Sequence, residues 1–142
     1  MTCSPYDEPA IKDSDLILRR VNPETHVIYD KNKNCHRISS KLYSMSSGTN
    51  MGMSVDVESL IVQDNIDPHA WVKSPPFMGA VSLEAGDIRS LNLQVGYDPI
   101  PSNKYHGEVW SKDQVPRFTK SQRKGLAIQA IWYETIPNVQ IR

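Results

Sequence analysis

Residues 80–99, "AVSLEAGDIRSLNLQVGYDP", carry the signals that decide the fold class. Apolar and β-branched residues at the beginning and near the end of the stretch are typical of two strands. Gly86 and Asp87 lie between them and predict a tight turn followed by one helical turn. A strand, a turn, a short helical segment and a second strand in this order favour a mixed α and β architecture.

Four further segments predict strands. "LILRRV" (16–21) is a short apolar run, which "NPET" interrupts. "HVIYD" (26–30) and "CHRIS" (35–39) flank the turn formers "KNKN", a pattern typical of a β-hairpin. "YHGEVWS" (105–111) alternates, so we expect a half-exposed strand.

Two segments predict helices. "RFTKSQRKGLAIQAIWYETI" (117–136) is the strongest helical pattern, and Pro137 ends it. Its apolar stripe is predicted to comprise Leu126, Ala127, Ala130 and Ile131. "MSVDVESLIVQ" (53–63) is ambiguous, and one interpretation is a short helix that Asp56 caps and that buries Val57, Leu60 and Ile61.

Together these segments predict a small, strand-rich α+β domain with one C-terminal helix. Residues 1–14 contain Pro5 and Pro9 among alternating charges, which predicts a flexible N-terminal arm. Residues 15–142 are then a single domain, a usual size for one hydrophobic core.

Composition limits the function. The 142 residues include 16 basic and 16 acidic side chains, so no net charge attracts the chain to nucleic acid or to anionic lipid. The N-terminus is polar and acidic, unlike a signal peptide, and no apolar run has the length of a membrane span. Cys3 and Cys35 make no disulfide framework. We therefore expect a cytoplasmic protein that does not associate with membranes.

Common catalytic motifs are absent from the sequence. Adjacent Cys35 and His36 would point to opposite faces of a strand, and the other histidines stand alone, so no metal site is expected. The same divergence argues against a nucleophilic Cys35 with His36 as its base. "GMSVD" around Ser54 lacks the second glycine of a nucleophile elbow. The glycine-rich nucleotide motifs are missing as well, and no cofactor is expected.

Arginines and serines remain as candidates for binding an anion. Arginine binds phosphate through two parallel hydrogen bonds, and a serine hydroxyl adds a donor. A histidine that titrates near neutrality adds a donor or a general acid–base. The candidate ligand-binding residues are Arg20, Arg37, Ser39, Ser40, Arg89 and His106.

Each candidate also has a purely structural interpretation. Arg19 and Arg20 point to opposite faces of a strand, so at most one of them is expected in a given site. Arg37 pairs with Asp30 across the hairpin in this interpretation. Ser39 and Ser40 cap the next turn, and His106 occupies a solvated strand face.

A basic run opens the C-terminal helical pattern. "RFTKSQRK" contains Arg117, Lys120, Arg123 and Lys124 without an acidic residue. Positive charge in the first turns opposes the helix dipole, which suggests an anionic partner: a nucleic-acid backbone, a nucleotide or an acidic protein surface. The alternative is a solvated helix end.

Five short motifs resemble a group of small uncharacterised bacterial proteins. They are, in order, "LRRV" (18–21), "RISSKLYS" (37–44), "MSVD" (53–56), "AGDIR" (85–89) and "PIPSNKYHGEV" (99–109). The resemblance covers most of residues 16–110. It implies a bacterial or phage origin and brings no activity with it.

Three functional hypotheses follow. The first is a non-enzymatic binding module of a larger bacterial assembly, or of a homo-oligomer, which recognises a phosphate-bearing ligand and presents Trp71, Phe77, Trp110 and Trp132 to a partner. The second is an ADP-ribosyltransferase-like or other nucleotide-processing enzyme. It predicts that Arg20, Ser39 and Glu108 converge in one cleft, with His106 as a further catalytic residue. The third is a nucleic-acid-binding accessory protein that uses the basic run, and the zero net charge disfavours it.

Overall fold

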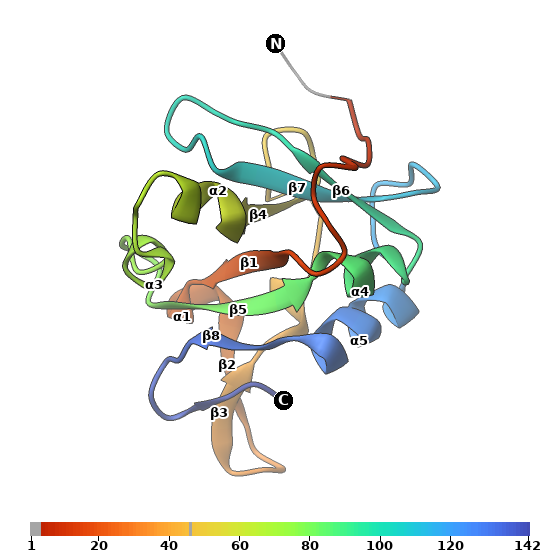
Figure 1. The fold of residues 1–142 in the computed structure, drawn as a ribbon. Helices are drawn as coiled ribbons and strands as arrows, with labels where there is room; N and C mark the ends of the chain where they lie inside the picture. Colours follow the sequence, from red (N-terminus) through yellow and green to blue (C-terminus); the bar gives the residue numbers. More distant parts are fainter. Residues whose placement is uncertain (1–3, 46) are drawn as a thin grey trace.

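The structure, a computed structural model, describes residues 4–45 and 47–142 (Figure 1). The strands are β1 (Leu16–Val21), β2 (Val27–Asp30), β3 (Cys35–Ile38), β4 (Met53–Val57), β5 (Gly79–Glu84), β6 (Leu93–Tyr97), β7 (His106–Ser111), β8 (Ile131–Glu134) and β9 (Val139–Gln140). The helices are α1 (Pro23–His26), the 3₁₀ helix η1 (Ser40–Leu42), α2 (Glu58–Gln63), α3 (Pro68–Trp71), α4 (Ala85–Arg89) and α5 (Lys120–Gln129). The α+β class expected from the sequence is confirmed.

Six strands form one antiparallel sheet in the order β6-β7-β4-β1-β5-β8. A second, three-stranded sheet has the order β2-β3-β9, in which β9 runs parallel to β3. In Figure 1, α2 and α3 lie to the left of the large sheet, and α4 and α5 lie to the right. Strands β4 and β1 are central, so each of them pairs with a neighbouring strand along both edges.

The apolar face of the large sheet holds the main core. Alternate residues of the central strands point into it, among them Ile17, Val55 and Val109. Residues from η1, α4 and α5 close the core from the other side, for example Leu42, Ile88 and Leu126. Burial of these side chains is the main source of stability, at roughly 25 cal/mol per Å² of apolar surface.

The intervening residues of the same strands point to the opposite face of the sheet, the polar face. Leu18, Ala80 and Tyr105 form a smaller apolar cluster there, which packs with Ile61 of α2 and with Val72. Beside this cluster, the same face carries charged and polar residues of β1, β4 and β7: Arg20, Ser54, Asp56, His106 and Glu108. Antiparallel partners share a face, so the register places the residues of β4 and β7 side by side, and Arg20 shares the face of Leu18, the partner of Asp56.

Several predicted elements are confirmed. Strand β1 has the predicted bounds, and β2 and β3 form the predicted hairpin. Residues 79–97 fold as strand, helical turn and strand. The ambiguous segment 53–63 divides into β4 and α2, and Val57, not Asp56, occupies the N-cap position.

The C-terminal helix is shorter than predicted. It ends at Gln129, Ala130 is extended, and residues 131–134 form β8 on the edge of the sheet beside β5. Ile131 was predicted to lie in the apolar stripe of the helix, but its side chain is 61% exposed. The reason is that Ile131, Trp132 and Tyr133 are strand formers, and β5 offers them a ladder of hydrogen bonds.

Strand β7 is buried on both faces and not half exposed as predicted. The apolar core covers one face, and residues 48–52 cover the other by hydrogen-bonding to Glu108 and Trp110. Trp110, predicted to be exposed to a partner, is 1% exposed, whereas Trp71, Phe77 and Trp132 are partly buried. Alternation along a strand cannot reveal a cover that comes from elsewhere in the chain.

The N-terminal segment packs against the domain within the described range. Glu8 N–H donates to the Val95 carbonyl at the β6 edge, and Ile11 is buried in the main core. Arg89 binds Asp7 and Asp13 from the same segment. The packed chain therefore begins before residue 15, where the sequence placed the boundary. Cys3 lies outside the described residues, and Cys35 is a free thiol.

Candidate functional site

A hollow of about 240 Å³ opens where β1 and β4 separate. The two strands pair only at Ile17 with Val57 and at Leu18 with Asp56. Beyond these pairs the Arg19 guanidinium connects the two strands, because its Nη1 donates a hydrogen bond to the Ser54 carbonyl at 3.1 Å. The hollow is lined by Arg19, Arg20, Asn22, Thr25, His26, Ser47, Ser54, Val55, Asp56 and Phe77.

Arg20 forms the charged wall of this hollow. Its Nε lies 3.1 Å from Asp56 Oδ2, and the guanidinium stacks on the Phe77 ring at 4.3 Å from the ring centre. Its side chain remains 21% exposed. The head group is thus oriented by a carboxylate and an aromatic face while still reaching the hollow.

Asp56 is buried and only partly satisfied. Asn103 Nδ2 donates to its Oδ1 at 2.6 Å. Its Oδ2 forms the ion pair with Arg20 but accepts no hydrogen bond within the described part of the chain. A buried carboxylate oxygen without a hydrogen bond is costly, so a donor from a ligand would be stabilised there.

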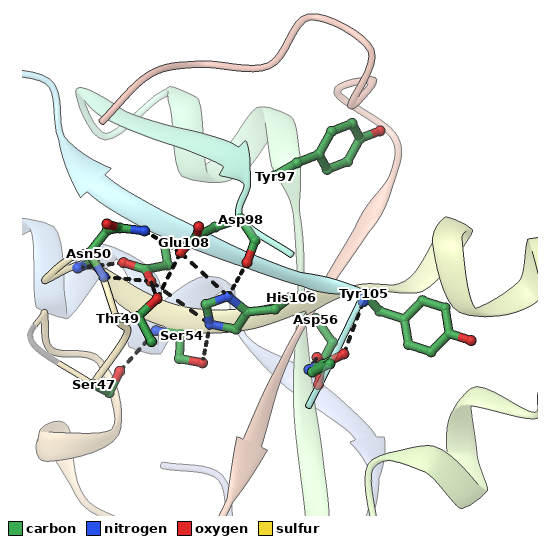
Figure 2. A network of polar contacts seen from close by, with 12 residues as sticks. Ser47, Thr49, Asn50, Ser54, Asp56, Tyr97, Asp98, Tyr105, His106 and Glu108 are labelled. Carbon is green, nitrogen blue, oxygen red and sulfur yellow. Dashed lines mark hydrogen bonds and ion pairs between the residues drawn. The ribbon is translucent and has the colours of Figure 1, made fainter. Parts of the chain in front are cut away.

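Ser54 and His106 form the second feature of the site (Figure 2). Ser54 Oγ lies 2.8 Å from His106 Nε2, and His106 Nδ1 lies 2.7 Å from the Asp98 carbonyl oxygen. A carbonyl oxygen only accepts, so Nδ1 carries the proton and donates it. In a neutral ring Nε2 is then an acceptor, and the Ser54 hydroxyl donates to it.

A pair of buried carboxyl groups lies behind this histidine. Asp98 Oδ2 is 3.7 Å from His106 Nδ1, and Glu108 Oε2 is 3.9 Å from Nε2. Thr49 Oγ1 donates to Asp98 at 3.1 Å and contacts Glu108 at 3.3 Å. The backbone N–H groups of Asn50 and Gly52 donate to Glu108, so residues 48–52 close over it (Figure 2).

The two carboxyl groups have opposite pKa shifts. Burial, together with the neighbouring Asp98, raises the pKa of Glu108 despite the backbone donors. Burial also acts on Asp98, but hydrogen bonds from Glu108, Asn50 and Thr49 outweigh it and lower the pKa of Asp98. Glu108 is therefore the more readily protonated of the two carboxyl groups, and Asp98 carries the negative charge.

Burial lowers the pKa values of two side chains that line the hollow. Desolvation and the neighbouring Arg20 lower the pKa of Arg19 to about 10, which leaves it charged at neutral pH. Desolvation and the Arg19 charge lower the pKa of His26 to about 4, which leaves it neutral. Two guanidinium groups and the Asp56 carboxylate then determine the local field, and an anionic group is favoured in the hollow.

Asp98, His106 and Glu108 are also close enough to raise the question of a metal ion. Their candidate ligand atoms all lie within 4.8 Å of one another. However, Asn50 Nδ2 donates to Asp98 Oδ2 at 2.6 Å, and Ser54 and the Asp98 carbonyl contact the two ring nitrogens. Protein groups thus occupy the positions that a cation would need, and the contacts describe a hydrogen-bond network.

Among the predicted site residues, Arg20, His106 and Glu108 reach this region, and Glu108 lies behind His106. Arg20 lines the hollow, and His106 reaches it through Ser54. Arg19 lines it too, although it points to the other face, because the hollow lies between two strands. The expectation that only one of the two arginines would serve a single site is therefore wrong. His106 is 2% exposed and not on a solvated face.

The other predicted residues lie elsewhere, and Arg37, Ser39 and Arg89 have structural partners there. Arg37 pairs with Asp30 at 2.8 Å, and Ser39 accepts from Lys41 N–H as the cap of η1. Ser40 is an exposed residue of η1. Arg89 donates hydrogen bonds to Asp7, to Asp13 and to the Glu8 carbonyl. The predicted convergence of Arg20, Ser39 and Glu108 is not found, since Ser39 caps η1 and Glu108 is enclosed by residues 48–52.

The basic run lies on the surface of α5 and the segment before it. Arg117, Lys120, Arg123 and Lys124 are all exposed. Thr119 and Gln122 form a capping box, which satisfies the N-terminal N–H groups of the helix. None of these four residues lines the hollow, so the basic run is a separate surface.

Sequence reasoning missed Ser54 as part of a site, and it considered Asp56 only as a helix cap. The available signal was the alternation in "MSVD", which places Ser54 and Asp56 on one strand face. A missing glycine excluded Ser54 only from the nucleophile-elbow motif, which is one of several ways to expose a serine.

No protein-family model, no curated protein and no solved structure matches the chain. No helix within residues 4–45 and 47–142 combines the length and the apolar character needed to cross a bilayer.

Proposed function

We propose that this protein binds a small metabolite in the hollow between β1 and β4, and that the ligand carries an anionic group beside a hydroxyl or amino group. The observation that carries the proposal is the Arg20–Asp56 pair. The Arg20 guanidinium lines the hollow, and the buried Asp56 Oδ2 that it ion-pairs accepts no hydrogen bond from the described residues. Arg20 would bind a carboxylate or phosphate, and Oδ2 would accept from the neighbouring donor.

The size of the hollow supports a small ligand. Its volume of about 240 Å³ lies below the roughly 300 Å³ at which pockets for drug-sized ligands begin. A hydroxy acid, an amino acid or a sugar phosphate suits this space, as does the phosphate end of a longer molecule. The stacking of Arg20 on Phe77 keeps the guanidinium in place before the ligand arrives.

The other two hypotheses have weaker support. An ADP-ribosyltransferase-like site needs Ser39 and Glu108 beside Arg20, and both have other partners. Nucleic-acid binding is supported only by the four exposed basic residues of the run, in a protein whose net charge is zero.

Calorimetry with glycolate, glycine, glycerol phosphate and inorganic phosphate as probes tests the proposal. We expect at least one probe to bind, and Arg20→Gln to weaken its binding by about 10- to 100-fold, since a charge-assisted hydrogen bond contributes about 1.5–3 kcal/mol. The matched control is Arg37→Gln, which removes an arginine that is also paired with an aspartate but lies outside the hollow. Equal loss in both variants, or no binding of any probe, would contradict the proposal.

A further inference from the structure

We propose that Ser54 is a catalytic nucleophile with His106 as its general base, and that the hollow hydrolyses an ester of a small anionic acid. This inference goes beyond ligand binding and rests on the proposed hollow only for the substrate class. It assigns a reaction to a serine and a histidine that lie on neighbouring strands of one sheet face.

The first argument is the geometry of the two side chains. A serine hydroxyl is a weak nucleophile unless a base within about 2.6–3.2 Å takes its proton. The distance of 2.8 Å between Ser54 Oγ and His106 Nε2 satisfies this condition. Ser54 also lines the hollow, so the hydroxyl lies where a ligand would sit.

The second argument is the orientation of the base. A base must have the correct tautomer, and a third group usually fixes it. Here the Asp98 carbonyl fixes Nδ1 as the protonated nitrogen at 2.7 Å. Asp98 Oδ2, at 3.7 Å from the same nitrogen, places a negative charge beside the imidazolium that forms when Nε2 accepts the proton.

The third argument is the set of donors available for a developing oxyanion. Ser47 Oγ accepts from Ser54 N–H at 2.9 Å, so its own hydroxyl hydrogen is directed elsewhere. Ser47 and Arg20 both line the hollow with Ser54. A hydroxyl and a guanidinium at this site would stabilise the negative charge that develops on the substrate carbonyl oxygen.

The reaction then proceeds in two balanced steps. His106 Nε2 takes the proton of Ser54, and Oγ forms a bond to the ester carbonyl carbon while the carbonyl electron pair moves onto oxygen. The tetrahedral species collapses, the bond to the alcohol oxygen breaks, and the alcohol leaves with the proton from His106. Water then attacks the acyl-Ser54 with its proton passing to His106, and the second collapse returns that proton to Ser54 and releases the acid. Ester and water give acid and alcohol.

A fluorophosphonate probe and two p-nitrophenyl esters test this assignment on the full chain. We expect the probe to add one phosphonyl group to Ser54, mapped by mass spectrometry. We expect p-nitrophenyl succinate, which carries a carboxylate, to be hydrolysed faster than p-nitrophenyl acetate. Ser54→Ala and His106→Gln should each reduce the rate by at least 100-fold, the usual contribution of a positioned base or nucleophile.

Ser90→Ala is the matched control, because it removes an exposed hydroxyl that only contacts the Asp87 carbonyl. It should retain full labelling and full rate. Thermal unfolding of each variant confirms folding, and labelling of the unmodified chain tests the assignment even where a variant fails to fold. If the unmodified chain takes no label and hydrolyses both esters no faster than Ser54→Ala, the assignment is wrong. Arg20-dependent binding of a metabolite in that case leaves the proposed function standing, whereas labelling without such binding removes the proposed function alone.

Discussion

The two faces of the six-stranded sheet are built from the same strands and differ in almost every physical respect. Ile17 and Val55 point to the apolar face and are buried in the main core. Their neighbours Leu18, Ser54 and Asp56 point to the polar face, where the polar pair joins a network with Arg20 and His106. Successive residues of a strand alternate between faces, so one strand supplies stability and chemistry at once.

The two faces are stabilised by different interactions. On the apolar face, burial removes hydrocarbon from water and no partner has to be chosen. On the polar face every buried group needs a specific partner, because an unpaired one costs about 1–3 kcal/mol. Residues 48–52 supply such partners to Glu108, whereas Asp56 Oδ2 lacks a hydrogen bond. Among the buried side-chain atoms of the described residues that lack a hydrogen bond, Asp56 Oδ2 is the one that belongs to a residue lining the hollow.

The largest expected effect comes from shortening a side chain of the apolar face. Ile17→Ala should lower the free energy of unfolding by about 2–5 kcal/mol, because the central strand cannot collapse into the space left behind. Ser54→Ala should lower it by less, about 1–3 kcal/mol, because it leaves the buried His106 Nε2 without its hydrogen bond. Denaturant unfolding measures both, and Ile128→Ala, at an exposed isoleucine, is the control. Equal losses from Ile17→Ala and Ser54→Ala would break the contrast between the faces.

A smaller effect is expected at the cover of the polar face. A Cβ on Gly48 would lie 2.2 Å from the Glu108 carboxyl carbon, which its hydrogen bonds hold in place. Gly48→Ala should therefore lower the free energy of unfolding by about 1–3 kcal/mol. Gly125→Ala is the matched control. Its Cβ meets only the end of the flexible Leu91 side chain, and alanine favours the helix. If Gly48→Ala left the free energy of unfolding unchanged, residues 48–52 would be able to move away from Glu108 at little cost.

The smallest expected effect is a pH dependence that arises in the hollow. The pKa of His26 is about 4 in the folded chain, below its ordinary value of about 6.5. The unfolded chain thus takes up the proton first, and the stabilisation present above pH 6.5 is lost as the pH falls from 6.5 toward 4. Because the ring is only about half buried, we expect a loss of about 1 kcal/mol.

Unfolding of the unmodified chain and of His26→Gln at pH 7, 6, 5 and 4 measures this contribution. The variant keeps an acceptor for Asn22 N–H but does not titrate, so the difference between the two proteins should shrink as the pH falls. His36→Gln, at an exposed histidine of β3, should keep the slope of the unmodified chain. A difference that is constant with pH would exclude His26 as the source.

Local patterns predicted the elements whose partners are near in sequence. The strand at 16–21, the hairpin and the segment 79–97 follow from apolar periodicity and from turn formers. The helix at 117–136 was overextended because helical and strand formers follow one another there without a break. Only the free edge of β5 decides that residues 131–134 pair as a strand.

The candidate site was only half predictable, for a different reason. Arg20 and His106 were identified by residue type, since arginine and histidine bind anions and move protons in many proteins. Arg89 and Arg37 are arginines that pair with carboxylates as Arg20 does, yet they lie outside the hollow. Which guanidinium borders a hollow is a property of the packed chain, and no single-residue rule provides it.

By itself, the sequence determined the α+β class, most of the strands and the residue types that are able to bind an anion, because these depend on alternation, on turn formers and on side-chain chemistry. Only the tertiary structure decided that Ser54 meets His106, 52 positions further along the chain, and that Asp56 meets Arg20. The physical reason is the register of β4 against β7 and the separation of β4 from β1 after two residue pairs. These features are set by how all the strands pack together, and no local segment of the chain encodes them.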